Sequence, residues 1–232
     1  MNKVALVTGT RKGIGFALAE YLISKGWIVF GCSRKEAEIK SANYHHYCLD
    51  ITNEKDVVHM VREIKRRFGS IYALINNAGI ASMNHVLLTP IQTCRSVFET
   101  NVTGSFILLR ECAKQMSQKK RGRIVNISSV ATPLNLEGEA VYAASKAAIE
   151  SLTRITAREL GTYGITVNAI GPTPIDTDLI RTVPKETIDQ LIKRQAIQRL
   201  GTPADITNCI DFFLREESDF ISGQVIYLGG IS

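Results

Sequence analysis

The feature that most constrains this 232-residue chain is a regular alternation of apolar runs of strand length with stretches of helical periodicity. The apolar runs are continuous rather than interrupted by polar residues, which is typical of strands buried on both faces of a parallel sheet. No linker, internal repeat or low-complexity tract breaks the pattern. The sequence therefore predicts an α/β fold, with helices covering both faces of a parallel sheet in one domain spanning residues 1–232.

Seven strands are expected, at residues 4–7, 28–32, 44–49, 71–75, 123–127, 165–170 and 224–228. Helices are expected at residues 14–25, 54–67, 91–118, 139–163 and 203–214, the last one capped by Thr202 and opened by Pro203. A polar segment at 178–198 predicts a short helical lid, and the brief stretch after Arg34 leaves room for one helical turn at most. We expect a Rossmann-type, doubly wound, seven-stranded sheet that binds its ligand at the carboxyl ends of the strands.

Composition excludes several classes of protein. The chain is 45% hydrophobic and has no apolar run of 18 residues, so no transmembrane helix and no membrane partner are expected. Its first residues are too short and β-like for a secretory signal. The cysteines are scattered, odd in number and without CxxC spacing: Cys32, Cys48, Cys94, Cys112 and Cys209. They favour a reducing cytoplasm and predict neither disulfides nor a metal site.

The net charge of +6 raises the question of an anionic partner. The densest basic cluster, residues 119–123, precedes a predicted strand and has no interleaved aromatic residues. Nucleic-acid binding is therefore not expected. We interpret the cluster as a solvated loop that also favours an anionic substrate.

A glycine-rich turn follows the first strand and reads Thr8-Gly9-Thr10-Arg11-Lys12-Gly13-Ile14-Gly15. Glycines permit a tight turn and close backbone approach, and the N-terminus of the next helix offers free N–H groups to a pyrophosphate. This context of strand, turn and helix predicts a dinucleotide site.

The end of the second strand points to the phosphorylated form of the cofactor. Ser33 and Arg34 stand where an acidic residue would bind the ribose hydroxyls of NADH, and arginine suits a phosphate. Lys12 is expected to add a second positive charge. We therefore predict NADP(H) as cofactor. Asp50, after the third strand, is expected against the adenine amino group, although Thr52 or Asn53 next to it could simply cap a helix.

Tyr142 and Lys146 are four residues apart on a predicted helix and so lie on one face of it. An adjacent ammonium favours the phenolate, so we expect Lys146 to lower the pKa of Tyr142. A phenol tuned in this way can exchange a proton with a carbonyl or alcohol oxygen, and the Ser129 hydroxyl can bond the same oxygen.

Together these residues resemble the short-chain dehydrogenase/reductase family, and among its subgroups most resemble the 3-oxoacyl-acyl-carrier-protein reductases. The resemblance covers nearly the whole chain. It rests on seven segments in order: Thr8–Gly15, Asn76–Gly79, Asn101–Gly104, Arg123–Ser129, Tyr142–Lys146, Asn168–Ile170 and Ile221–Gln224.

The resemblance implies that Tyr142 transfers the proton, Lys146 lowers its pKa and bonds the nicotinamide ribose, and Ser129 positions the substrate oxygen. Asn101 would hold a water that links Lys146 to solvent, or would only satisfy backbone groups. Ser128 would be structural. The cofactor-binding set would be Gly9, Arg11, Lys12, Gly13, Ile14, Gly15, Ser33, Arg34, Asp50, Ile51, Asn77, Ala78, Gly79, Tyr142, Lys146, Pro172, Thr173, Ile175 and Thr177.

Three departures from the family pattern are expected to matter. Thr173 replaces a usual glycine, and Pro174 restricts it to extended conformations, so the loop over the nicotinamide is expected to follow another path. The brief lid predicts an open pocket. Lys120 matches one basic position beside the active-site entrance where an acyl carrier docks, but Tyr163 stands where a second arginine is usual.

The leading hypothesis is a cytoplasmic NADPH-dependent carbonyl reductase of the kind used in fatty acid biosynthesis. Its small-molecule carbonyl substrate would be a 3-oxoacyl thioester carried on acyl carrier protein or coenzyme A. The alternatives are a reductase or dehydrogenase of a sugar, polyol or secondary-metabolite ketone, and a non-catalytic NADP(H) sensor. The resemblance also implies a homotetramer, or a homodimer, assembled through the two long helices.

Overall fold

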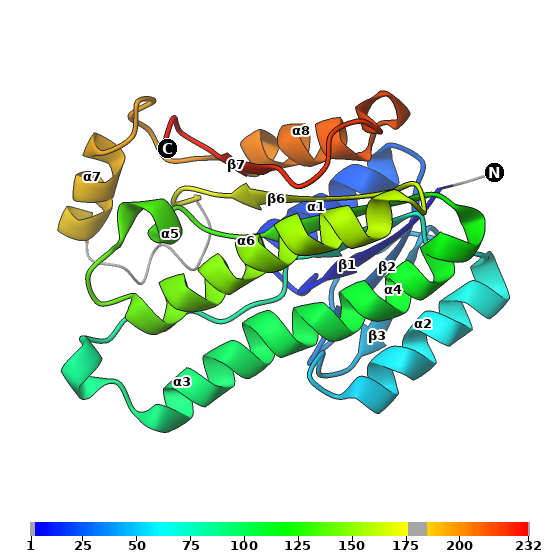
Figure 1. The fold of residues 1–232 in the computed structure, drawn as a ribbon, viewed down its shortest axis with the longest axis horizontal. Helices are drawn as coiled ribbons and strands as arrows, with labels where there is room; N and C mark the ends of the chain where they lie inside the picture. Colours follow the sequence, from blue (N-terminus) through cyan, green and yellow to red (C-terminus); the bar gives the residue numbers. More distant parts are fainter. Residues whose placement is uncertain (1–2, 176–184, 232) are drawn as a thin grey trace.

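A computed structural model of the chain describes residues 3–175 and 185–231. Its centre is one seven-stranded parallel sheet in the order β3-β2-β1-β4-β5-β6-β7 (Figure 1). The strands are β1 (Val4–Thr8), β2 (Ile28–Ser33), β3 (Tyr44–Cys48), β4 (Ala73–Asn76), β5 (Gly122–Ile127), β6 (Ile165–Gly171) and β7 (Val225–Tyr227). The predicted doubly wound parallel sheet is confirmed, because every pairing is parallel and the strand order reverses direction at β1.

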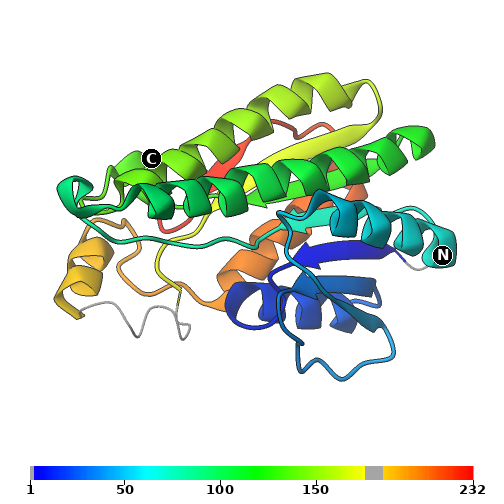
Figure 2. The ribbon, with the colours of Figure 1, turned by 90° about the horizontal axis from the view of Figure 1, so that it is seen from below.

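The helices form one layer on each face of the sheet, which Figure 2 shows from the side. They are α1 (Gly13–Ser24), α2 (Glu54–Phe68), α3 (Ile91–Phe98), α4 (Ser105–Lys119), α5 (Ala131–Leu134), α6 (Ala140–Gly161), α7 (Lys185–Lys193) and α8 (Pro203–Leu214). Helices α2, α4 and α6 cover one face, and α1 and α8 cover the other.

Each face of the sheet has its own apolar core, because successive strand residues point to opposite faces. One core contains Leu6 and Phe30 of the strands with Met60 of α2 and Leu108 of α4. The other contains Val7, Val29, Leu18 of α1, Ile210 of α8 and Phe213 of α8. Continuous apolar strands are what this two-sided burial requires.

Local capping fixes where two of the helices begin. The side chain of Asn53 accepts hydrogen bonds from the backbone N–H groups of Lys55 and Asp56 at the start of α2. At the start of α8, Thr202 and Asp205 form a reciprocal capping box, with Pro203 in the first turn. The predicted cap by Thr202 is confirmed, and Asn53 rather than Thr52 caps α2.

The expected single helix over residues 91–118 is wrong in one respect. Between α3 and α4 the chain forms a π-helical segment, Glu99–Gly104, which contains Asn101. The Asn101 side chain exchanges hydrogen bonds with the backbone of Ile80, with its Oδ1 accepting at 2.8 Å and its Nδ2 donating at 3.0 Å. These bonds hold the Asn101 side chain against the backbone of Ile80. Short π-helical segments of this kind are frequent at functional sites.

The other connections follow the sequence expectations. Residues 34–43 contain no helix, as the short spacing predicted. Helix α7 falls within the predicted lid and turns Thr187, Ile188, Leu191 and Ile192 to its more buried side. Within the described ranges, no helix combines the length and apolar character needed to cross a bilayer.

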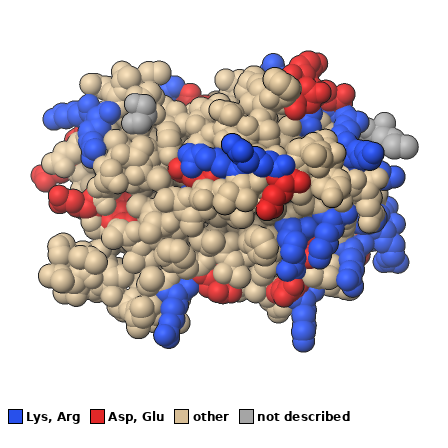
Figure 3. Space-filling model, in the orientation of Figure 1, with Lys and Arg blue, Asp and Glu red and all other residues tan. Residues whose placement is uncertain are grey.

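Part of the positive charge lies in the last turns of the helices. Lys65, Arg66 and Arg67 occupy the last turn of α2, and Lys119 the last turn of α4. Figure 3 shows Lys and Arg side chains gathered at that end of the face. Cations at helix carboxyl ends offset the negative end of the helix dipole, so part of the basic charge stabilises the helices.

Gly31, in the middle of β2, gives a test of this packing. A Cβ on Gly31 would lie 2.1 Å from the Tyr44 hydroxyl and 2.4 Å from Thr10 Oγ1. We expect Gly31→Ala to lower the free energy of unfolding by about 1–3 kcal/mol, as overpacking does, measured by urea denaturation. Gly161→Ala is the matched control, since a Cβ there meets nothing within 4 Å. Equal stability of the two variants would contradict this packing.

Candidate active site

A cleft of about 720 Å³ opens at the carboxyl ends of the central strands. It lies where the strand order reverses, with β2 on one side of β1 and β4 on the other, which is where ligands bind in such sheets. Of the residues predicted to bind a cofactor, the following line it: Gly9, Arg11, Lys12, Gly13, Ile14, Ser33, Arg34, Asp50, Ile51, Asn77, Ala78, Gly79, Tyr142 and Lys146.

The glycine-rich turn forms the floor of the cleft. Gly9 and Gly13 have φ angles of 74° and 63°, which other residues rarely adopt. The Thr8 hydroxyl accepts hydrogen bonds from the backbone N–H groups of Asn77 and Ala78, at 3.0 and 2.8 Å. The Asn77 amide donates to the Thr8 carbonyl at 2.8 Å, so the ends of β1 and β4 are tied together.

Gly15 supports this turn from beneath and is absent from the lining of the cleft. A Cβ on Gly15 would lie 2.4 Å from the Gly9 carbonyl oxygen and 2.5 Å from the Asn77 amide nitrogen. Its role is therefore close packing of α1 against the turn, which allows the amino end of α1 to face the cleft.

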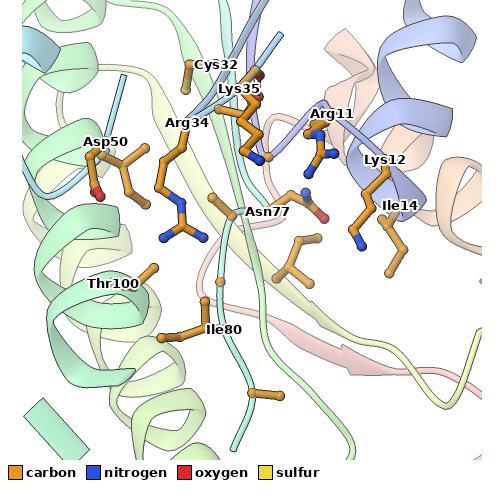
Figure 4. A pocket seen from close by; sticks show the side chains of 18 of the residues that line it. Arg11, Lys12, Ile14, Cys32, Arg34, Lys35, Asp50, Asn77, Ile80 and Thr100 are labelled. Atoms are coloured by element: carbon orange, nitrogen blue, oxygen red, sulfur yellow. Dashed lines mark hydrogen bonds between the residues drawn. The ribbon is translucent and has the colours of Figure 1, made fainter. Parts of the chain in front are cut away.

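Besides Lys146, four cations line the cleft: Arg11, Lys12, Arg34 and Lys35. Among the lining residues that the structure describes, Asp50 is the one carboxylate. In Figure 4, Arg34, Lys35 and Arg11 follow one another across the view, and Lys12 lies beyond Arg11 beside Ile14. This excess of positive charge suits a ligand that carries several phosphates.

A chain of hydrogen bonds braces the loop that carries Arg34 and Lys35. The Tyr44 hydroxyl, on β3, lies 2.8 Å from Thr10 Oγ1 and 2.7 Å from His46 Nδ1. His46 Nε2 lies 3.1 Å from the Lys35 carbonyl oxygen and 3.2 Å from Ser33 Oγ. The side chain of Tyr44 passes over Gly31, so the brace joins the glycine-rich turn to the loop after β2.

Asp50 fixes the turn before α2 and also faces the cleft. Its Oδ1 accepts from the backbone N–H and the hydroxyl of Thr52, at 3.0 and 2.8 Å, which fixes the turn before α2. The same residue lines the cleft beside Ile51, so the adenine contact stays a prediction.

The other end of the cleft holds Tyr142 and Lys146, both on α6. The ammonium of Lys146 is buried, lies 5.7 Å from the centre of the Tyr142 ring, and donates to the Ile127 carbonyl at 2.8 Å. Burial lowers the pKa of Lys146 to about 8. Ser129, just after β5, accepts from the backbone N–H of Ala131 through its hydroxyl.

The expected lowering of the Tyr142 pKa is not found in the ligand-free protein. Burial of the phenol raises the pKa of Tyr142 to about 12, a hydrogen bond with Ser129 acts in the opposite direction, and the nearby charge of Glu139 raises it further. Moving the phenolate out of water costs more free energy than its hydrogen bond with Ser129 recovers. Tyr142 is therefore a protonated phenol near neutral pH.

Asn101 reaches the same region from the π-helical segment. Besides its bonds to Ile80, its Nδ2 donates to Ser145 Oγ at 2.9 Å. A Cβ on Gly79 would lie 3.1 Å from Asn101 Oδ1 and 3.4 Å from Lys146 Nζ, so these groups converge on Gly79. The backbone-satisfying role of Asn101 is confirmed, and the water relay stays a prediction.

Ser128 has the structural place expected for it. Its hydroxyl donates at 2.6 Å to Oε1 of the buried Glu150, which also accepts from the Tyr227 hydroxyl at 2.7 Å. These bonds link β5, α6 and β7 beneath the catalytic end of the cleft.

Some predicted residues lie elsewhere. Pro172, Thr173 and Ile175 are absent from the lining of the cleft, and Thr177 lies outside the described residues. Thr173 is buried and avoids positive φ, as its proline neighbour requires. Ile175 instead forms a parallel bridge with Gly201.

Other lining residues were missed by sequence reasoning: Cys32, Lys35, Leu49, Ile80, Ala81, Thr100 and Ile127. Of these residues, Lys35 could most easily have been predicted, because it directly follows Arg34 after β2. Glu139 was also missed. It precedes α6 three residues before Tyr142, and burial raises the pKa of its carboxyl.

Lys120 was expected beside the entrance of the active site, and within one chain it does not lie there. Lys120 and Tyr163 precede β5 and β6, whereas Ser129 follows β5. The first two residues therefore lie at the amino ends of the strands and Ser129 at the carboxyl ends. At about 3.3 Å per residue, the six residues of β5 separate them by roughly 20 Å. Neighbouring Arg121 is ion-paired with Glu216.

Known proteins resemble this chain along nearly its full length. A family model described as enoyl-(acyl carrier protein) reductase matches residues 9–231. The 3-oxoacyl-[acyl-carrier-protein] reductase FabG of Staphylococcus epidermidis is 33% identical over 240 residues, which cover 99% of this chain and 98% of that protein.

Two solved structures share both fold and sequence. The ligand-free aldohexose dehydrogenase of Thermoplasma acidophilum superposes with a TM-score of 0.90 at 30% identity, covering 99% of this chain and 94% of that one. ElxO with NADP bound superposes with a TM-score of 0.91 at 30% identity, covering 98% and 97%.

The buried Lys146 predicts an unusual pH dependence of stability. Its folded pKa of about 8 lies below the ordinary 10.5, so between these values the unfolded chain binds more protons and stability rises with pH. We expect Lys146→Met to be more stable than wild type near neutral pH. Its advantage should shrink by about 2 kcal/mol between about pH 7.5 and about pH 9.5, in urea unfolding. Lys119→Met, at an exposed position, is the control, and a pH-independent advantage of Lys146→Met would refute the burial argument.

Proposed function

The chain belongs to the short-chain dehydrogenase/reductase family, and we propose that it is an NADPH-dependent reductase of 3-oxoacyl thioesters. Members of this family are oxidoreductases that interconvert CH–OH and C=O groups with a nicotinamide cofactor. The observation that carries the proposal is the meeting of Ser129, Tyr142 and Lys146 at one end of a cleft whose other end is lined by four cations.

The residues present fit a phosphorylated dinucleotide. Two positive-φ glycines and the amino end of α1 form a cradle for a pyrophosphate. Arg34, Lys35 and Arg11 line the cleft side by side (Figure 4), and none forms an ion pair within the described chain. Their free charge favours NADP(H), the cofactor bound in the related ElxO structure.

A nicotinamide cofactor held by the glycine-rich turn and the cations of the cleft would supply the hydride for the carbonyl carbon in the proposed reaction. Tyr142 donates its phenolic proton to the carbonyl oxygen, and the Ser129 hydroxyl holds that oxygen by a hydrogen bond. The raised pKa of Tyr142 keeps the proton on the phenol until negative charge develops on the substrate oxygen. Lys146 would then return a proton to Tyr142 and would itself be reprotonated from solvent through a water held by Asn101.

The substrate class rests on similarity. A thioester substrate is favoured by the 33% identity to the Staphylococcus epidermidis 3-oxoacyl-[acyl-carrier-protein] reductase. A sugar substrate is favoured by the fold and 30% identity shared with an aldohexose dehydrogenase. The position of Lys120, remote from Tyr142 in the same chain, makes coenzyme A thioesters the simpler first substrate to test.

The proposed assembly is the homotetramer of the family, formed through α4 and α6. Exposed apolar side chains on these helices support it, since Phe106 and Ile155 are 42% and 53% exposed.

The activity can be tested by following the oxidation of NADPH with acetoacetyl-coenzyme A. We expect turnover by the wild type and a loss of about 10²–10⁴-fold in kcat for Tyr142→Phe, because the proton donor is removed while the cleft is kept. NADPH binding by that variant should stay near normal. Full activity in Tyr142→Phe would refute the mechanism. Oxidation of an aldohexose with NADP⁺ in place of thioester reduction would select the sugar alternative, and binding without any turnover would select the sensor.

The cofactor preference can be tested at Arg34. We expect Arg34→Asp to weaken NADPH binding about ten- to hundredfold, the loss of a charge-assisted bond, and to weaken NADH binding far less. Lys40→Asp is the matched control, because it makes the same charge change in the same loop outside the cleft. Equal weakening of NADPH and NADH would mean that Arg34 does not contact the 2′-phosphate.

A further inference from the structure

Three side chains of metal-binding type meet at the edge of the sheet. Their ligand atoms, from Glu36, His46 and Cys48, all lie within 4.8 Å of one another. We propose that they form a site for a zinc ion. The inference is independent of the proposed function, since it concerns metal binding alone.

The fold explains how these residues come together. His46 and Cys48 are two residues apart on β3, so their side chains point to the same face of the sheet. Glu36 lies in the helix-free loop after β2, the strand that pairs with β3. The loop folds back over β3, and the Cys48 thiol donates to Glu36 Oε1 at 3.2 Å.

The donor set selects the metal. A thiolate, an imidazole nitrogen and a carboxylate suit Zn²⁺, whereas Mg²⁺ and Ca²⁺ prefer oxygen ligands alone. Three protein ligands leave a fourth tetrahedral position for water. On binding, the Cys48 S–H bond breaks and a sulfur–zinc bond forms. The proton passes to the buffer, and no oxidation state changes.

A neighbouring hydrogen bond orients the histidine as zinc sites require. The Tyr44 hydroxyl is 2.7 Å from His46 Nδ1 and is itself held by Thr10 at 2.8 Å. His46 Nε2 faces the loop that carries Glu36 and donates its proton to the Lys35 carbonyl at 3.1 Å, so Nδ1 accepts from Tyr44. When Nε2 binds zinc, this proton moves to Nδ1, which then donates to the Tyr44 hydroxyl. Partners of this kind, outside the ligand set, fix the ring and its tautomer in metal sites.

Cysteine spacing could not reveal this group. Only one of the three ligands is a cysteine, and the glutamate comes from a different segment. The H-x-C pair on a strand becomes a candidate only when the loop after β2 is seen to lie against it.

The experiment measures zinc bound to the full-length protein by equilibrium dialysis with metal analysis, after treatment with a chelator. We expect one zinc per chain for the wild type. Cys48→Ser should lower the affinity about tenfold or more, and Tyr44→Phe about tenfold, as loss of an orienting partner does. Cys209→Ser, at a partly buried cysteine outside the cluster, should bind like the wild type.

Cobalt gives a second reading, because a thiolate bound to Co²⁺ produces a charge-transfer band in the near ultraviolet. The wild type and Cys209→Ser should show the band, and Cys48→Ser should lose it. Glu36→Gln keeps the loop volume and should weaken binding without removing the band. Failure of the wild type to bind zinc stoichiometrically, or retention of the band by Cys48→Ser, would overturn the proposal.

Discussion

The cleft depends on the hydrogen bonds that tie the end of β1 to the end of β4. Thr8 accepts from two backbone N–H groups after β4, and Asn77 donates back to the Thr8 carbonyl. These bonds join the turns that follow β1 and β4 at the point where the strand order reverses, which is where the ligand cleft opens. A side chain at Gly15 would strike the Asn77 amide and the Gly9 carbonyl, so these bonds require glycine at that position of the turn.

Desolvation governs the catalytic end. The same burial that lowers the pKa of Lys146 raises that of Tyr142, so both groups are moved towards their neutral forms. A neutral phenol is a proton donor that is already desolvated, and it requires little reorganisation when charge appears beside it. Lys146 is held in place by the Ile127 carbonyl rather than by a carboxylate, which leaves its charge available to the site.

The sequence predicted the architecture well because the strand cores are apolar on both faces and the helices carry caps such as Thr202. It predicted most of the cleft, from Gly9 to Lys146, because the carboxyl ends of parallel strands must meet and because the family resemblance implied the remaining positions. The sequence predictions failed where contacts between distant residues determine the local structure or a pKa. The π-helical turn at Asn101 depends on the backbone of Ile80, and the tyrosine pKa depends on burial that no spacing reveals. The position predicted for Lys120 was wrong within one chain, because a residue before a strand and a residue after it lie at opposite ends of that strand.

The two ends of the cleft are built by different means. The catalytic end rests on a long helix and a central strand, so its geometry is fixed by the core. The end that carries Arg34 rests on β2, the edge strand β3 and a loop without a helix, so side-chain contacts must order it. Tyr44 and His46 supply some of those contacts, and the bond between Cys48 and Glu36 supplies another. The conformation of the loop that carries Arg34 therefore depends on these few polar side chains, whereas the geometry of Tyr142 and Lys146 depends on the apolar core.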